Sequence, residues 1–328
     1  MAQNEIIKEA LSKTTDRRRL LKRLATAGAA VGAAVTTGGL QAQSPPAGPS
    51  AADVIQFALN LEYLEAEFYS VATTGQTLAM RGVPISGTGT AGATTAATTN
   101  AIGNFVNFSN NVFSGRQPAV NIAADEVAHV ILLRTALMNN GVTPVAKPAI
   151  NLDALAALGA SLSNQNSFLY LARIFEDIGV SAYGGGAALL AGSPYLTTAA
   201  RILAVEGEHA GNIRLQIASL GIPTMPIDAV DIVPPPSSNA VTAGTTAANP
   251  YLSSASQVST ANGFYNFFST NPANGLSAIR TPGQVLYLAY GVGLGAGTSA
   301  GGGFFPNGVN GAINTASSAA TASGLALV

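Results

Sequence analysis

The 328-residue chain contains no cysteine and no tryptophan, and only 9% of its residues are charged. The absence of cysteine excludes disulfide bonds, thiolate metal sites and cysteine nucleophiles, and it is compatible with either redox compartment. The formal net charge is -1 at pH 7 and no basic patch lies outside the N-terminal segment, so no nucleic-acid partner is expected. Histidine is also scarce, because His129 and His209 are the only two.

Both histidines lie in the same local pattern. Glu126 precedes His129 by three residues, and Glu206 precedes His209 by the same distance. Residues three apart lie on one face of a helix, so a carboxylate and an imidazole at this spacing can bind one metal ion together. Two such helices, with one Glu from each of two other helices, form the ligand pattern of carboxylate-bridged two-metal sites. The sequence therefore predicts a dinuclear metal site.

The two further carboxylates are found in matching surroundings. Glu62 is followed seven residues later by Tyr69, and Glu176 is followed seven residues later by Tyr183. The chain thus repeats a unit, Glu-x6-Tyr and then Glu-x-x-His. Glu65, one turn from Glu62, is an alternative ligand, but only Glu62 reproduces the offset to Tyr. The predicted metal ligands are Glu62, Glu126, His129, Glu176, Glu206 and His209.

Other polar residues adjoin these ligands in the sequence. Tyr69 and Tyr183 are expected to hydrogen-bond ligand carboxylates. A second set either orients the ligands or forms surface ion pairs, which contribute little to stability, and the sequence leaves both alternatives open. This set consists of Asp125, Asp177, Arg134 and Arg214, and Glu65 joins it if Glu62 is the ligand.

Three phrases carry a family resemblance: Leu-Glu-Tyr-Leu-Glu-Ala-Glu-Phe-Tyr ending at Tyr69, Asp-Glu-Val-Ala-His ending at His129, and Phe-Glu-Asp-Ile-Gly-Val-Ser-Ala-Tyr ending at Tyr183. The chain resembles the ferritin-like superfamily, and within it the branch of exported, desiccation-related-type proteins. The resemblance covers about residues 51–220, with a looser likeness at 280–286 and 303–311. It implies an all-α, ferritin-like four-helix bundle with a dinuclear iron or manganese centre. It does not fix a reaction, because this fold supports several.

The function expected from this centre is oxidation of Fe(II) or reaction with oxygen or peroxide. Glu126 and Glu206 are predicted to bridge the two metal ions, with Glu62 and Glu176 as terminal ligands. An oxygen-rich site with one imidazole per metal suits iron or manganese better than soft metals. The alternative is a non-catalytic structural or desiccation-protective protein that keeps a structural or vestigial metal site. An oligomer is compatible with either alternative.

Helical periodicity and helix-end signals predict four long helices. The first begins at Ser50 or Asp53 and ends near Thr73. The others run from about Pro118 to Asn140, from Asn164 to Ala188, and from Pro194 to Leu220. Residues 76–100 are predicted to form a long loop, followed by a short helix over 101–113. Gly179 and the glycines at 184–186 predict that the third helix frays or kinks after Tyr183.

The N-terminal segment is typical of a targeting sequence. Arg17, Arg18 and Arg19 resemble a twin-arginine export motif, and a mildly apolar run to Leu40 precedes a small-residue cleavage site at Ala42. Residues 1–42 are therefore predicted to be a signal peptide of a periplasmic or otherwise exported protein. Glycines and threonines make the run a poor membrane anchor. Its removal takes seven basic and three acidic residues from totals of 15 and 16, which leaves a net charge of -5.

The remaining boundaries follow from composition. Residues 43–50 are rich in Pro and Ser and are predicted to be a linker, and 51–221 are predicted to form the bundle. Residues 222–328 form a C-terminal extension, mostly irregular and dominated by small and polar residues. Its scattered aromatic residues predict that it packs on the bundle or on a partner subunit, because disordered segments contain few aromatic residues.

Overall fold

The computed structural model describes residues 48–109, 115–224, 258–259, 264–265, 270 and 275–319. The predicted signal peptide and most of the predicted linker lie outside these residues. Within the described ranges, no helix is both long enough and apolar enough to cross a membrane.

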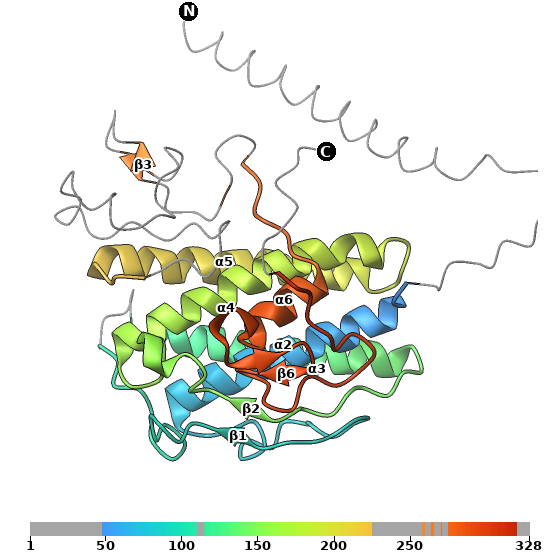
Figure 1. The fold of residues 1–328 in the computed structure, drawn as a ribbon, viewed down its shortest axis with the longest axis horizontal. Helices are drawn as coiled ribbons and strands as arrows, with labels where there is room; N and C mark the ends of the chain where they lie inside the picture. Colours follow the sequence, from blue (N-terminus) through green and yellow to red (C-terminus); the bar gives the residue numbers. More distant parts are fainter. Residues whose placement is uncertain are drawn as a thin grey trace, which may run out of the picture. The chain divides into compact units, whose positions relative to one another are not determined.

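Four long helices dominate the described part of the chain (Figure 1). They are α2 (Ala51–Thr74), α3 (Arg116–Asn139), α4 (Gln165–Gly186) and α5 (Leu196–Leu220). Helix α2 packs mainly against α3, and α4 packs mainly against α5. Buried apolar side chains of all four helices form one core, as expected for amphipathic helices in a bundle. The structure thus confirms the predicted all-α class.

Local signals in the sequence explain where the helices begin and end. Ser50 caps α2: its Oγ accepts from the backbone N–H of Asp53 at 3.2 Å, and the Asp53 carboxylate accepts from the Ser50 N–H at 2.9 Å. The side chain of Asn164 caps α4 by accepting from the backbone N–H groups of Asn166 and Ser167. Gly75, with φ of 71°, ends α2 in the left-handed conformation that glycine adopts without strain. Helix α3 begins at Arg116, slightly earlier than the predicted start at Pro118.

Helix α4 does not end at its glycines. It continues through Gly184, Gly185 and Gly186, so the predicted fraying after Tyr183 is wrong. The C-terminal segment explains these residues, because a Cβ on Gly185 would lie 1.9 Å from the carbonyl oxygen of Arg280. Glycine therefore allows the backbone of the C-terminal segment to approach the helix closely.

The connections between the helices are mostly irregular and are fixed to the bundle. The short helix predicted over 101–113 is absent from residues 101–109, which are irregular apart from a turn at 102–104, and 110–114 lie outside the described residues. The buried Lys147 anchors the loop after α2, because its Nζ donates to the Gly92 carbonyl at 2.8 Å and to Thr94 Oγ1 at 2.9 Å, and lies 3.6 Å from Glu67 Oε1 on α2. In the same region β1 (Thr94–Thr95) pairs in parallel with β2 (Ile150–Asn151).

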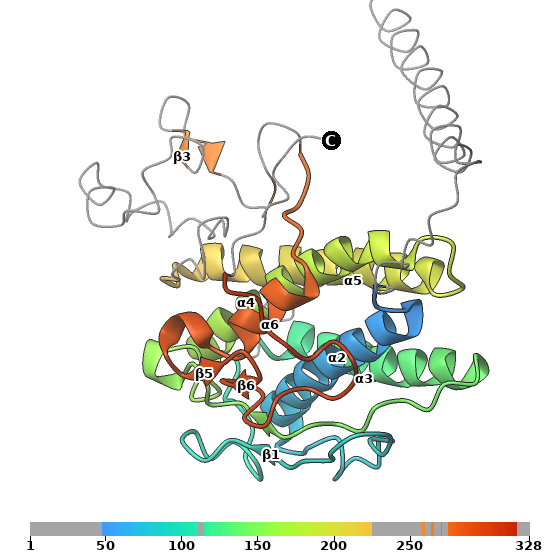
Figure 2. The same cartoon turned by 45° about the vertical axis from the view of Figure 1, so that its right-hand side comes forward.

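Residues 275–319 pack on the helices, with α6 (Pro282–Ala289) lying beside α4 (Figures 1 and 2). The Phe304 ring contacts the Phe175 ring of α4 edge-on, with centroids 4.9 Å apart. Asn310 joins three segments, because its backbone N–H donates to Asn60 Oδ1 on α2 and its side chain donates to the Thr90 and Ala146 carbonyls. The other short elements of the described residues are the 3-10 helices Ala156–Leu158, Ala187–Leu190 and Val292–Leu294, and the strand pairs β3 (Val258–Ser259) with β4 (Phe264–Tyr265) and β5 (Gly297–Thr298) with β6 (Gly301–Gly302).

Candidate metal centre

The six predicted ligands meet in the interior of the bundle. Every one of the four long helices contributes at least one of them, and all six are buried. The four glutamates are 0% exposed and the two histidines are 6% exposed. The helical spacing of Glu-x-x-His is what directs both side chains of α3, and both of α5, to the same interior region. These residues, together called the Glu/His centre, are Glu62, Glu126, His129, Glu176, Glu206 and His209.

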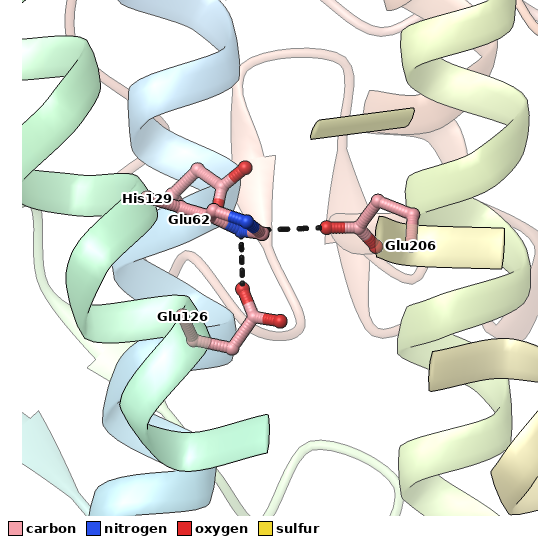
Figure 3. A group of neighbouring side chains, drawn as sticks. All are labelled: Glu62, Glu126, His129 and Glu206. Carbon is pink, nitrogen blue, oxygen red and sulfur yellow. Dashed lines mark hydrogen bonds and ion pairs between the residues drawn. The ribbon is translucent and has the colours of Figure 1, made fainter. Parts of the chain in front are cut away.

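The first group in the centre surrounds His129. Its Nδ1 lies 3.2 Å from Glu62 Oε2, 3.3 Å from Glu126 Oε2 and 3.8 Å from Glu206 Oε1. Figure 3 shows Glu206 reaching toward this imidazole from a helix that faces the two helices carrying His129, Glu126 and Glu62. One ligand atom from each of these four residues lies within 4.8 Å of the others, which is close enough for one metal ion to bind them together.

The second group surrounds His209. Its Nδ1 lies 3.0 Å from Glu126 Oε1 and 3.3 Å from Glu176 Oε2. Glu126 therefore belongs to both groups, with one carboxylate oxygen directed to each histidine, as a bridging ligand requires. Glu206 belongs to the group around His129, and its other carboxylate oxygen borders Gly179. The predicted role of Glu206 as a second bridge stays a prediction.

The two tyrosines connect the two halves of the bundle, α2 with α3 and α4 with α5, in a crosswise manner. The hydroxyl of Tyr69 on α2 donates to Glu176 Oε1 on α4, and the hydroxyl of Tyr183 on α4 donates to Glu62 Oε1 on α2. Each tyrosine thus holds the carboxylate of the other half, and the Oε2 atom of that carboxylate faces a histidine. The repeat in the sequence places the tyrosines, but only the packing of α2 against α4 shows this exchange of partners.

Electrostatic interactions in the centre favour protonated histidines when no metal is bound. Burial lowers the pKa of His129, but Glu62 and Glu126 outweigh this effect and raise that pKa to about 11. Burial also lowers the pKa of His209, but Glu126 and Glu176 outweigh this effect and raise that pKa to about 12. Burial raises the pKa of Glu126 to about 7. The two imidazolium groups therefore compensate part of the negative charge that the centre contains.

A fifth buried carboxylate, Glu65, lies beside the centre. It is 5% exposed, and burial followed by the charge of Glu206 raises its pKa well above the usual range. A Cβ on Gly179 of α4 would lie 2.3 Å from Glu206 Oε2 and 3.3 Å from Glu65 Oε1, so both carboxylates use the space that glycine leaves. Glu62 is the α2 residue that belongs to the group around His129, and Glu65 belongs to neither group.

Of the other predicted neighbours, Asp125 contacts a ligand, with its Oδ2 3.2 Å from His209 Nε2. The rest make different contacts. Arg134 donates to the Tyr63 hydroxyl at 2.6 Å and to the Ser86 carbonyl at 2.8 Å. Arg214 donates to Asp177 at 2.8 Å.

One of the two expected alternatives for these three residues is therefore wrong. Arg134, Arg214 and Asp177 are buried, so they are not surface ion pairs, and their role in orienting the ligands stays a prediction. Arg173 is a further member of the Asp177 cluster, 3.3 Å from Asp177, and the sequence analysis missed it. Its position four residues before Asp177 on a helix is the signal that could have identified it.

The hydrogen bonding of the ligand atoms indicates whether a metal ion fits this centre. Several buried side-chain atoms in the centre have no hydrogen-bond partner, although they approach one another closely. Buried polar atoms normally have such partners, so this accumulation of donor atoms fits a cation-binding site. The mixture of carboxylates with one imidazole in each group suits a hard metal ion. The atoms are Glu62 Oε2, Glu126 Oε1, Glu176 Oε2, both carboxylate oxygens of Glu206, and His209 Nδ1.

The bundle and its buried Glu/His centre together define a ferritin-like protein with a possible metal site. In agreement with this class, the model of the family described as "Ferritin-like domain" matches residues 50–219, slightly more than half of the chain. The chain therefore belongs to the ferritin-like domain family. No match was found among the curated proteins.

Proposed function

We propose that the Glu/His centre binds two iron or manganese ions and that the protein uses them to react with oxygen or peroxide, oxidation of Fe(II) included. One observation supports this proposal above all: buried donor atoms without hydrogen bonds converge from four helices into two groups that share Glu126.

Charge balance favours two divalent ions over the protonated histidines. Four ionised ligand carboxylates carry four negative charges, which two divalent ions neutralise and two imidazolium groups compensate only by half. Burial of uncompensated charge is costly, so bound metal stabilises the bundle with its ligand carboxylates ionised. Oxygen-rich coordination with one imidazole per ion favours iron or manganese.

The residues around the metal positions have separate tasks. Glu126 would be a ligand of both ions, and Tyr69 and Tyr183 orient the carboxylates of Glu176 and Glu62. Iron or manganese, when bound, supplies the electrons with which oxygen or peroxide is reduced. The chain has no cysteine for an electron-transfer centre, so the reductant is external or is the Fe(II) substrate itself.

We further propose that the protein is exported through the twin-arginine pathway and that its metal is bound before export. The twin-arginine-like motif of residues 17–19 and the ligand set occur in one chain. The resemblance of the signal to that pathway implies export of folded cargo. Cell fractionation tests the localisation, and a precursor with Glu126→Ala tests the order of events. Normal export of the metal-free precursor would contradict early metal binding.

Elemental analysis followed by an oxygen and peroxide assay tests the function. The purified protein is compared with Glu126→Ala, which removes the shared ligand, and with Glu208→Ala, which removes an exposed acidic residue of α5 outside both groups. For the unmodified protein and for Glu208→Ala we expect two ions per chain and consumption of oxygen or peroxide. For Glu126→Ala we expect neither. Bound metal without any consumption would support the structural or desiccation-protective function. Absence of iron and manganese after reconstitution would refute the proposal.

A further inference from the structure

The two halves of the bundle are nearly equivalent, and their differences distinguish the two metal positions. Glu62 corresponds to Glu176, Glu126 to Glu206 and His129 to His209 in the repeat, and the crosswise tyrosines preserve this correspondence in space. A perfectly repeated site would have two equal positions. Two of the differences between the halves lie against ligand side chains: Glu65 corresponds to Gly179, and Asp125 corresponds to Val205.

The first difference enriches the His129 position in negative charge. Three carboxylates can bind one metal ion together with His129, whereas two can do so with His209. Gly179 makes this possible, because the second oxygen of Glu206 occupies the space where a side chain would stand, and Glu65 Oε1 borders the same space. A position with more carboxylates binds a hard divalent ion more tightly, because each adds both a donor oxygen and charge.

The second difference supports the His209 position instead. Asp125 Oδ2 lies 3.2 Å from His209 Nε2, while Nδ1 of the same ring faces Glu126 and Glu176. Among the described residues no carboxylate contacts Nε2 of His129, and the residue that corresponds to Asp125 is Val205, which has no acceptor. A carboxylate at the outer nitrogen of a ligand histidine fixes the tautomer and the orientation of the ring and makes the inner nitrogen a better donor.

We propose that the centre binds its two metal ions unequally: the position around His129 fills first, and the position around His209 fills second and depends on Asp125 as a positioning residue. The inference rests on the proposed function, because it assumes a dinuclear centre. It adds an order of filling and assigns a role to a residue outside the ligand set.

Metal titration of the purified, metal-free protein tests this order. Mn²⁺ is added under a competing chelator, and the affinity of each step is measured together with the EPR signal of the bound ion. We expect two separate steps for the unmodified protein. Glu176→Gln removes a ligand of the second position only, so it should keep the tighter step and lose the weaker one.

Asp125 variants test the positioning role. Asp125→Ala should weaken only the second step, by about 10-fold to 100-fold, which is the usual effect of losing a carboxylate behind a ligand histidine. Asp125→Asn, which keeps an acceptor oxygen, should recover part of this loss. The control is Glu208→Ala, which removes an exposed acidic residue beside His209 and should leave both steps unchanged. Circular dichroism confirms that each variant is folded.

The outcomes separate this inference from the function on which it rests. Two steps of equal affinity in the unmodified protein, an unchanged second step in Asp125→Ala, or an effect of that variant on the tighter step would each overturn the inference and leave the dinuclear centre intact. Failure of the unmodified protein to bind any metal would overturn both.

Discussion

The substitution Gly179→Ala tests why α4 has a glycine, which carries no side chain, at this position. In an ordinary helix interior, alanine in place of glycine stabilises the protein by about 0.8–1 kcal/mol. Here the new Cβ would stand 2.3 Å from Glu206 Oε2 and 3.1 Å from its Cδ. We therefore expect the substitution to impair the metal centre even though it favours the helix.

The structure gives the size of the displacement. Ordinary van der Waals contact of a Cβ begins at 3.4 Å, whereas Glu206 Oε2 would lie 2.3 Å from the new Cβ. The Glu206 carboxylate must therefore move away by about 1 Å. Metal–ligand distances tolerate deviations of only about 0.2 Å. The displaced carboxylate thus no longer fits the group around His129, the position that we propose to fill first. Because a side chain moves and the backbone does not, the bundle itself should remain folded.

The matched control is Gly207→Ala on α5, where a Cβ would have no neighbour within 4 Å. Thermal unfolding is measured for both variants with a chelator and with added Mn²⁺. Gly207→Ala should be stabilised under both conditions. Gly179→Ala should bind less metal and should lose most of the stabilisation that metal gives to the unmodified protein. Full metal content in Gly179→Ala, with the same gain in stability as the control, would refute the steric argument.

Three further predictions concern pH, a tyrosine and the C-terminal segment. The pKa of His129 is raised to about 11 and that of His209 to about 12, so each imidazole must release a proton to bind metal. The apparent metal affinity should therefore rise between pH 6 and 9 by up to roughly tenfold per pH unit for each proton released. Calorimetry in buffers of different ionisation enthalpy measures this proton release, and a pH-independent affinity would contradict the prediction. Tyr183→Phe removes the donor to Glu62 and should weaken metal binding by about 10-fold or more, measured by chelator competition, whereas wild-type affinity would show that the hydrogen bond does not orient the ligand. Asn310→Ala removes the side-chain hydrogen bonds that tie the C-terminal segment to two loops and should lower the free energy of unfolding by about 1–3 kcal/mol in urea titrations; an unchanged midpoint would indicate that the segment adds no stability.

The ligand set and the fold class follow from sequence for a physical reason. Helical periodicity is local, so the spacing of Glu126 and His129 determines that both side chains share one face whatever packs against it. The same argument applies to Glu206 and His209, and the repeated seven-residue offset from a Glu to a Tyr singles out Glu62 and Glu176 as the further candidates. Helix ends were also predictable where a capping side chain or a glycine is local, as at Ser50 and Gly75.

Other features depend on contacts between segments far apart in the chain, and only the tertiary structure decided them. Gly179 appeared to be a weak point of α4, but it provides space for Glu206 from another helix. Arg134 stands at the same offset from its histidine as Arg214, yet one binds Tyr63 and the other binds Asp177, because different segments cover them. The asymmetry between the two metal positions has the same origin. Sequence spacing fixes which side chains share a helix face, whereas helix packing fixes which faces meet.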